Sequence, residues 1–305
     1  MKTDHLRKSN NVEDRRGQSG SLPGGNYGRQ GGMSGGNILL PLLFSRMGWK
    51  GKLLLLLLLL VFAGGGMGNL LGGDTGYSSY QSTQVGTPAS DVTDDEAEFV
   101  SKVLASTEDF WTEEFRRHGQ TYNAPKLVFY TGQTHTACGV GQASSGSFYC
   151  SADRTVYLDI SFYRELTTKY RAKGDFAMAY VIAHEVGHHV QNESGIMNQY
   201  ARSRQGMSEK QANELTVRLE LQADYYAGAW AKYVDGLGYL DVGDIEEAMA
   251  AAHAVGDDTL QKEAYGRVVP DSFTHGTSEQ RKRWFDRGYQ YGDIEHGDTF
   301  NAVTL

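Results

Sequence analysis

The sequence is poor in cysteine, and its two cysteines are not spaced as zinc ligands. Among 305 residues only Cys138 and Cys150 occur, so the short C-x-x-C spacing of thiolate zinc sites is absent. The segment between them is rich in glycine and serine. A loop of this kind closed by a disulfide is typical of proteins in an oxidising compartment. We therefore predict a structural disulfide between the two cysteines.

Positive charge is scarce in most of the chain, whose net charge is −8 at pH 7. Residues 1–52 contain nine Lys or Arg and three Asp or Glu, a balance of 9 − 3 = +6, and the remaining residues account for −14. An acidic body is not typical of proteins whose main partner is nucleic acid. We expect no nucleic-acid partner.

Charge is missing altogether from Leu53 to Gly73. As a helix, this run would span about 32 Å, which is enough to cross a bilayer. Basic residues precede it and Asp74 follows it, so the positive-inside rule predicts a cytoplasmic N-terminus. We predict a single-pass protein of the cell inner membrane, with its C-terminal domain in the periplasm or otherwise outside the cytoplasm. A cleaved signal peptide is the alternative, but its n-region would be long and no A-x-A site follows.

Composition divides the chain into four parts. Residues 1–37 are polar, basic and rich in glycine, and we predict that they are disordered. Residues 38–73 form a membrane-associated segment with one transmembrane helix at about 53–71. Residues 74–92 read as a linker, and residues 93–305 as the folded domain.

Apolar periodicity and capping motifs outline that domain. Helices are predicted at about 94–118, 161–172, 176–192, 208–236, 244–255, 257–265 and 278–290, and strands at 126–131, 147–150 and 155–160. Ser208 and Thr277 each open a capping box. The fold class is α+β: a mostly helical domain with a small, antiparallel-containing β-sheet before the 176–192 helix.

The 176–192 helix contains an H-E-x-x-H motif, from His184 to His188. Residues four apart share one helix face, so both imidazoles can bind one metal ion. Glu185 points about 100° around the helix, where it can contact a metal-bound water. The helix is apolar almost all round, and a metal would satisfy its buried polar groups. A surface helix with two chance histidines is the alternative.

Two histidines need a third ligand, and no H-x-x-G-x-x-H extension supplies one here. The 208–236 helix offers Glu220 and Asp224, four residues apart among apolar neighbours. One carboxylate can ligate the metal while the other holds a ligating imidazole through its second nitrogen. A solvated acidic face is the alternative.

Together these motifs resemble the bacterial family of putative neutral zinc metallopeptidases. The resemblance to this family covers nearly the whole chain from about residue 38. The chain is more distantly similar to the membrane gluzincins, which include the CAAX prenyl proteases. It rests on His184-Glu-x-x-His188, Glu220-x-x-Ala-Asp224, Thr274-His275-Gly-x-x-x-x-Arg281, Cys-Gly…Phe-Tyr-Cys and Val-Tyr-Leu-Asp. A zincin-like fold with one zinc ion is implied.

The resemblance also implies a role for each matching residue. His184, His188 and Glu220 correspond to the zinc ligands, Glu185 to the general base, and Asp224 to a residue that supports a ligand.

A transition-state role is implied for His275 or Arg281, either of which would steady the oxyanion. On the residues alone, His275 could equally be a helix cap or a core histidine. His189 lies about 100° from His188 and is not expected to share its metal.

Three functions are compatible with these features. The first is a membrane-anchored zinc endopeptidase that hydrolyses protein or peptide substrates outside the cytoplasm. The second is a zinc-stabilised, non-catalytic module that binds peptide segments for a membrane complex. The third is a zinc amidase that cuts peptidoglycan cross-links. The sequence indicates neither the substrate nor the oligomeric state.

Overall fold

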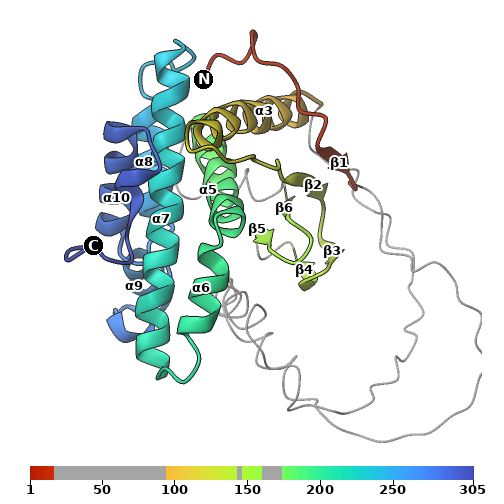
Figure 1. The fold of residues 1–305 in the computed structure, drawn as a ribbon. Coiled ribbons are helices and arrows are strands. Elements are labelled where there is room, and N and C mark those ends of the chain that lie inside the picture. The colour runs from red at the N-terminus through yellow and green to blue at the C-terminus, as the bar shows by residue number, and fades with distance from the viewer. Residues whose placement is uncertain (17–93, 143–145, 160–173) are drawn as a thin grey trace, which may run out of the picture.

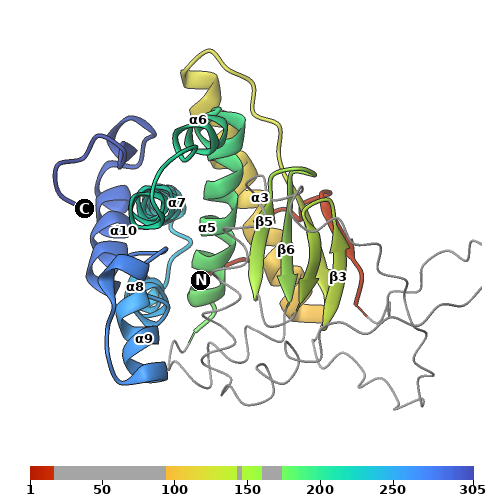
Figure 2. The same ribbon diagram turned by 90° about the horizontal axis from the view of Figure 1, so that it is seen from below.

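The computed structural model describes residues 1–16, 94–142, 146–159 and 174–305. A small sheet forms one side of the protein and helices form the other (Figure 1). Seen from below, helix α5 (Phe176–Glu193) lies between the sheet and helix α7 (Glu209–Gly236), as Figure 2 shows. The predicted fold class is therefore confirmed in its coarse form, a mostly helical protein with a small sheet.

The helices follow the predicted boundaries closely. Besides α5 and α7 they are α3 (Asp94–Arg117), α6 (Ile196–Ser203), α8 (Asp244–Ala254), α9 (Asp257–Tyr265) and α10 (Ser278–Tyr291), with short 3-10 turns at Pro270–Ser272 and Glu295–Gly297. Both predicted capping boxes are present, at Ser208 and at Thr277. Helix α6 was not predicted, and the predicted helix at 161–172 lies outside the described residues.

The main sheet has the strand order β1-β2-β6-β5. Its strands are β1 (Val12–Asp14), β2 (Lys126–Tyr130), β6 (Thr155–Asp159) and β5 (Ser147–Cys150). β1 and β6 both pair parallel with β2, whereas β5 pairs antiparallel with β6. β5 is thus the edge strand on one side, and it packs against α5.

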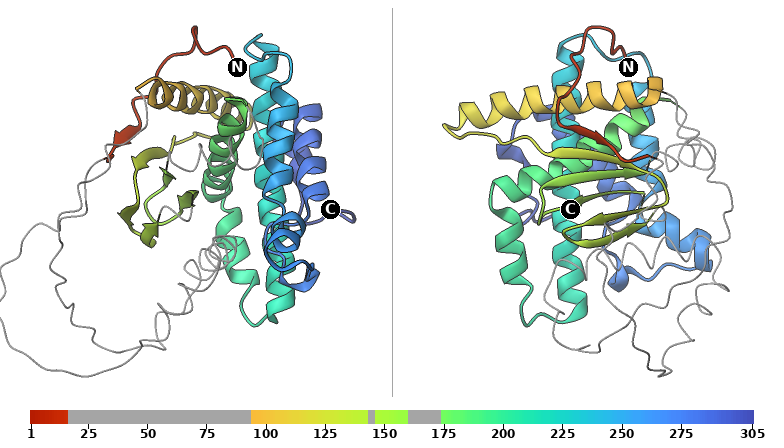
Figure 3. Two further views of the ribbon diagram at one scale, coloured as in Figure 1. Left: turned by 180° about the vertical axis from the view of Figure 1, so that it is seen from behind. Right: turned by 90° about the vertical axis from the view of Figure 1, so that its right-hand side faces the viewer.

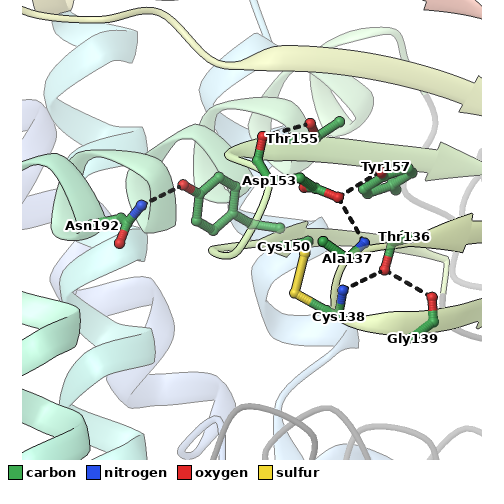
Figure 4. Close-up of a disulfide and its surroundings, with 10 residues drawn as sticks. Thr136, Ala137, Cys138, Gly139, Cys150, Asp153, Thr155, Tyr157 and Asn192 are labelled. Carbon is green, nitrogen blue, oxygen red and sulfur yellow. Dashed lines mark hydrogen bonds between the residues drawn. A yellow bond between two sulfur atoms is a disulfide. The ribbon is translucent and has the colours of Figure 1, made fainter.

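A second, two-stranded sheet pairs β3 (Gln133–Thr136) with β4 (Gly139–Gln142). The predicted disulfide between Cys138 and Cys150 is confirmed. It ties the hairpin to the last residue of β5 (Figure 4). The turn of the hairpin is held by Asp153, whose carboxylate accepts hydrogen bonds from the Ala137 amide and the Tyr157 hydroxyl.

The first sixteen residues correct the prediction that residues 1–37 are disordered. They run across α3 to the sheet (Figure 3), where β1 adds a strand. Arg7 forms an ion pair with Glu108 of α3, and the α-amine of Met1 forms one with Asp244. Met1 is buried in the main core, and Leu6 and Val12 pack against that core. Backbone pairing and ion pairs hold the segment as well, and composition does not reveal contacts of that kind.

Asp175, immediately before α5, binds the N-terminal segment. Its side chain makes no capping bond to α5 and instead accepts a hydrogen bond from the Met1 amine at 2.9 Å. The Asp175 carboxylate thus holds the N-terminal segment next to the first residue of α5.

The membrane prediction is corrected as well. The membrane-associated segment 38–73 and the linker 74–92 lie outside the described residues, and no helix of the described part is long and apolar enough to cross a membrane. α3 and α7 have the length, but charged residues recur along both. Residues 1–16 pair with β2 and contact α3, so they share one folded body with the described residues from 94 onward, whereas a single crossing between the two parts would separate them. The prediction of a single-pass inner-membrane protein with a cytoplasmic N-terminus and an external catalytic domain is therefore wrong.

Candidate metal centre

Helix α5 is buried and largely apolar, but polar side chains lie on two of its faces. His184 and His188 lie on the face toward α7. Glu185 and His189, each one residue later, lie on the neighbouring face toward β5. The spacing of four residues within each pair places its members one above the other. α5 therefore carries His184 and His188 on the side toward α7 and two groups that contact β5 on the other side.

Three donor atoms of His184, His188 and Glu220 converge between α5 and α7. Glu220 Oε2 lies 3.3 Å from His184 Nε2 and 3.4 Å from His188 Nε2. These distances are longer than a good N–H···O hydrogen bond. They match the separation of about 3.4 Å between two ligands that each lie about 2.0–2.1 Å from a tetrahedral zinc. Two imidazole nitrogens and a carboxylate oxygen are also the donor set of a catalytic zinc site, so these residues fit the metal.

The second nitrogen of each histidine is held by a hydrogen bond. His184 Nδ1 lies 2.9 Å from Asp224 Oδ1, and His188 Nδ1 lies 2.9 Å from Gln191 Oε1. When Nδ1 donates its proton to these oxygens, the lone pair of each ring is on Nε2, which faces the centre. Asp224 thus contacts the nitrogen of His184 that faces away from Glu220. Gln191 was missed, although its place three residues after His188 on the same helix is a local signal.

Asp224 is the hub of a buried network. Its carboxylate accepts hydrogen bonds from the Tyr180 hydroxyl at 2.6 Å and from Arg281, Nε at 2.9 Å and Nη2 at 3.0 Å. Arg281 Nη2 also bonds the Tyr180 oxygen, and Nη1 donates to the Val255 carbonyl. The guanidinium of Arg281 therefore binds Asp224, on the side of His184 away from Glu220, and not the cluster's centre itself. Arg281 is thus connected to His184 through Asp224.

His275 lies beside the Glu220 carboxylate of the cluster. Its Nε2 is 3.9 Å from Glu220 Oε2. The loop that carries it is fixed by Asp257 at the start of α9, whose Oδ2 accepts hydrogen bonds from the backbone amides of Thr274, His275 and Gly276. His275 is therefore held in place by its backbone while its ring faces the ligand carboxylate.

Glu185 is buried beside the cluster and faces the sheet. Its Oε1 accepts a hydrogen bond from the Ser147 hydroxyl, at the start of β5, with a distance of 2.9 Å. Sequence reasoning missed Ser147, because nothing local distinguishes this serine from the others in its loop.

Electrostatics favour a cation at this centre. Burial alone would lower the pKa of His184, but the Asp224 carboxylate outweighs it and raises that pKa to about 9. Burial would likewise raise the pKa of Glu220, yet His188 and His275 hold it well below its usual range. Two buried carboxylates thus remain ionised around the imidazoles, an arrangement that a divalent metal would neutralise.

The other histidine of the motif region has a structural role. His189 is fully buried, its Nε2 donates to the Asn123 carbonyl at 2.6 Å, and its Nδ1 accepts a hydrogen bond from the Tyr149 hydroxyl at 3.0 Å. As predicted, it does not face the cluster.

Comparison with known proteins gives relatives along the whole chain. The uncharacterized protein YpfJ of Escherichia coli (strain K12) is 47% identical over 302 residues, which cover 98% of this chain and 99% of that protein. The uncharacterized protein Rv2575 of Mycobacterium tuberculosis (strain ATCC 25618 / H37Rv) is 43% identical over 195 residues, 60% of this chain and 65% of that protein. No solved structure matches this chain significantly. The family described as putative neutral zinc metallopeptidase matches residues 1–300, and the chain belongs to this family.

Proposed function

We propose that this protein is a gluzincin-type peptidase that hydrolyses peptide bonds in protein or peptide substrates with one zinc ion. The observation that carries the proposal is the convergence of His184 Nε2, His188 Nε2 and Glu220 Oε2 at distances of 3.3 and 3.4 Å. Family membership supports the zinc and the peptidase class. Bound there, zinc lowers the pKa of a coordinated water and polarises the substrate carbonyl.

The chain's own residues supply the proton transfers. Glu185 is the general base: it takes the proton of the attacking water and then delivers it to the leaving amine. Its neighbour on the helix, His184, is a ligand, so the carboxylate is fixed beside the reacting centre. His275 is the group placed to donate a hydrogen bond to the oxyanion. Asp224, supported by Arg281, keeps the His184 ring oriented.

The proposal is tested with the full chain by metal analysis and casein hydrolysis. We expect about one zinc per wild-type chain, loss of that zinc in Glu220→Ala, and hydrolysis that a chelator abolishes. Glu185→Gln is the decisive variant, because glutamine has nearly the same shape but cannot take a proton. It should retain the metal and lose nearly all turnover. An unchanged rate in Glu185→Gln would contradict the mechanism, and zinc without hydrolysis in the wild type would contradict the activity.

A further inference from the structure

Two side chains of β5 that face α5 have nearly the same spacing along the strand as their two partners have along the helix. Ser147 and Tyr149 are two residues apart on a strand, a rise of about 6.6 Å. Glu185 and His189 are four residues apart on a helix, a rise of about 6.0 Å. The two pairs therefore lie opposite each other, and Ser147 bonds Glu185 at 2.9 Å while Tyr149 bonds His189 at 3.0 Å.

The Tyr149–His189 pair fixes the helix against the strand. The His189 ring uses both nitrogens, one toward Asn123 and one toward Tyr149, and burial lowers its pKa, so that the neutral ring is favoured. Asn192, one turn from His189, donates a second hydrogen bond to the Tyr149 oxygen at 2.9 Å (Figure 4). Rotation of α5 about its axis would break these contacts together.

The strand is also held on its other face and at its end. Phe148 stacks on Tyr157 of the neighbouring strand with ring centroids 5.0 Å apart. Cys150, the last residue of β5, is fully buried and disulfide-bonded to Cys138. Ser147 therefore projects from a fixed strand toward a fixed helix.

We propose that Ser147 is a positioning residue for the general base, an inference that rests on the function proposed above. Its hydroxyl holds Oε1 of Glu185, which leaves Oε2 as the oxygen that takes the proton of the attacking water. Ser147 acts on the substrate only through Glu185.

The hydrogen bond from Ser147 reaches a buried carboxylate. A hydrogen bond to an ionised carboxylate is stronger than one between neutral groups, and Glu185 is only 7% exposed, so water replaces the serine poorly. Residues that orient a catalytic group from behind typically contribute about 10- to 100-fold in activity.

The test uses three full-length variants. In Ser147→Ala we expect kcat for casein to fall about 10- to 100-fold, with KM, zinc content and urea stability close to those of the wild type. Ser147→Thr keeps a hydroxyl at the same place and should recover most of the loss. Tyr149→Phe is the matched control on the same strand face. It removes only the hydroxyl: the ring still packs edge-on against His189, and His189 keeps its hydrogen bond to Asn123. We therefore expect α5 to stay in place, with a lower stability and a kcat nearly unchanged.

Binding of a peptide hydroxamate to the zinc-loaded proteins gives a readout independent of turnover. A hydroxamate chelates zinc and donates a proton to a neighbouring carboxylate, so a misplaced Glu185 should weaken its binding. We expect Ser147→Ala to bind it several-fold more weakly than Tyr149→Phe does.

Three results would overturn the role of Ser147: an unchanged kcat in Ser147→Ala, an equal loss in Tyr149→Phe, or equal hydroxamate affinities. Failure of the proposed function has a different signature. If zinc-loaded wild type hydrolyses nothing, the peptidase proposal fails, and the hydroxamate comparison alone then decides whether Ser147 orients Glu185. A wild type that binds no zinc would contradict both.

Discussion

At the scale of single residues, the centre depends on Gln191. Its Oε1 lies 2.9 Å from His188 Nδ1, and its amide nitrogen donates to the Leu219 carbonyl at 2.7 Å and to Gln222 at 3.1 Å. The amide is therefore fixed in the orientation that presents its oxygen to the histidine. Gln191 supports His188 as Asp224 supports His184.

Replacing Gln191 by leucine should weaken zinc binding about 10- to 100-fold, because the His188 ring loses the partner that fixes its tautomer. The zinc dissociation constant is measured by competition with a chromophoric chelator. Asn192→Ala is the control, since this neighbouring amide contacts Tyr149 and not the centre. Equal zinc affinities in Gln191→Leu and wild type would show that His188 needs no orienting partner.

Arg281 is expected to stabilise the fold through its contact with Asp224. The resemblance of the motifs allowed it a role at the oxyanion, whereas its contacts attach it to the fully buried Asp224. Arg281→Met leaves that carboxylate without its cation, and the free energy of unfolding should fall by about 3–5 kcal/mol. Urea unfolding measures it. A variant with normal stability and zinc but a reduced kcat would instead support the oxyanion role.

The residues predicted from sequence are those whose geometry is local. His184 and His188 lie four apart on one helix, as do Glu220 and Asp224, and helical spacing alone places each pair on one face. Ser147 was missed and His275 was named only through the family resemblance, because both reach the centre from elements distant in the sequence. Their positions depend on how β5 and the loop before α10 pack, and no local pattern contains that information.

At the scale of elements, α7 and α10 meet through two glycines. A Cβ on Gly288 would clash with the Tyr225 carbonyl of α7, and one on Gly228 would clash with the Phe285 carbonyl of α10. This close approach brings Arg281 of α10 within reach of Asp224 of α7.

Gly288→Ala should therefore push α10 from α7 and destabilise the protein by about 1–3 kcal/mol, the range of an overpacked core. The zinc-binding residues should loosen with it, so zinc affinity is measured beside urea unfolding. Gly236→Ala is the matched control: it lies at the end of α7 with nothing near its Cβ position. We expect that substitution to leave stability unchanged or slightly raised. Equal stabilities of the two variants would contradict the close-packing argument.

An element could be predicted when the residues that define it are consecutive in the sequence. α7 and α10 each begin at a capping box of four consecutive residues, and the start of both helices was predicted from that motif. β1 has three residues and no buried side chain, and it is a strand because β2 offers it a partner. A strand of that kind has no periodicity to detect.

At the scale of the whole molecule, the N-terminal segment joins the sheet to the helices. Residues 1–16 contact α3, β2 and the loop before α8. Deleting residues 2–16 should lower the free energy of unfolding by about 2–4 kcal/mol, since several backbone and charged hydrogen bonds are lost. A synthetic peptide of residues 1–16 should restore part of the loss in trans, and a scrambled peptide should not. Full stability without the segment would show that the domain is complete from residue 94 onward.

The ion pairs of the Met1 amine make part of this stability depend on pH. Burial would lower the pKa of the amine, but Asp175 and Asp244 outweigh it and raise that pKa above its usual 8.0. The folded protein therefore holds this proton more tightly than the unfolded chain. The resulting stabilisation is fully present below about pH 8 and is lost as the pH rises through the raised value.

Urea unfolding of wild type and Asp244→Asn between pH 7 and pH 10 tests this directly. The wild type should be more stable at pH 7, and the gap between the two proteins should narrow as the pH rises. In the metal-free protein the pKa of His184 is raised to about 9, so this ring would also titrate in the window. It is present in both chains, so its contribution cancels in the difference. A gap that stays constant up to pH 10 would mean that Asp244 stabilises the fold through its other hydrogen bond, from the Asp241 amide, and not through the amine.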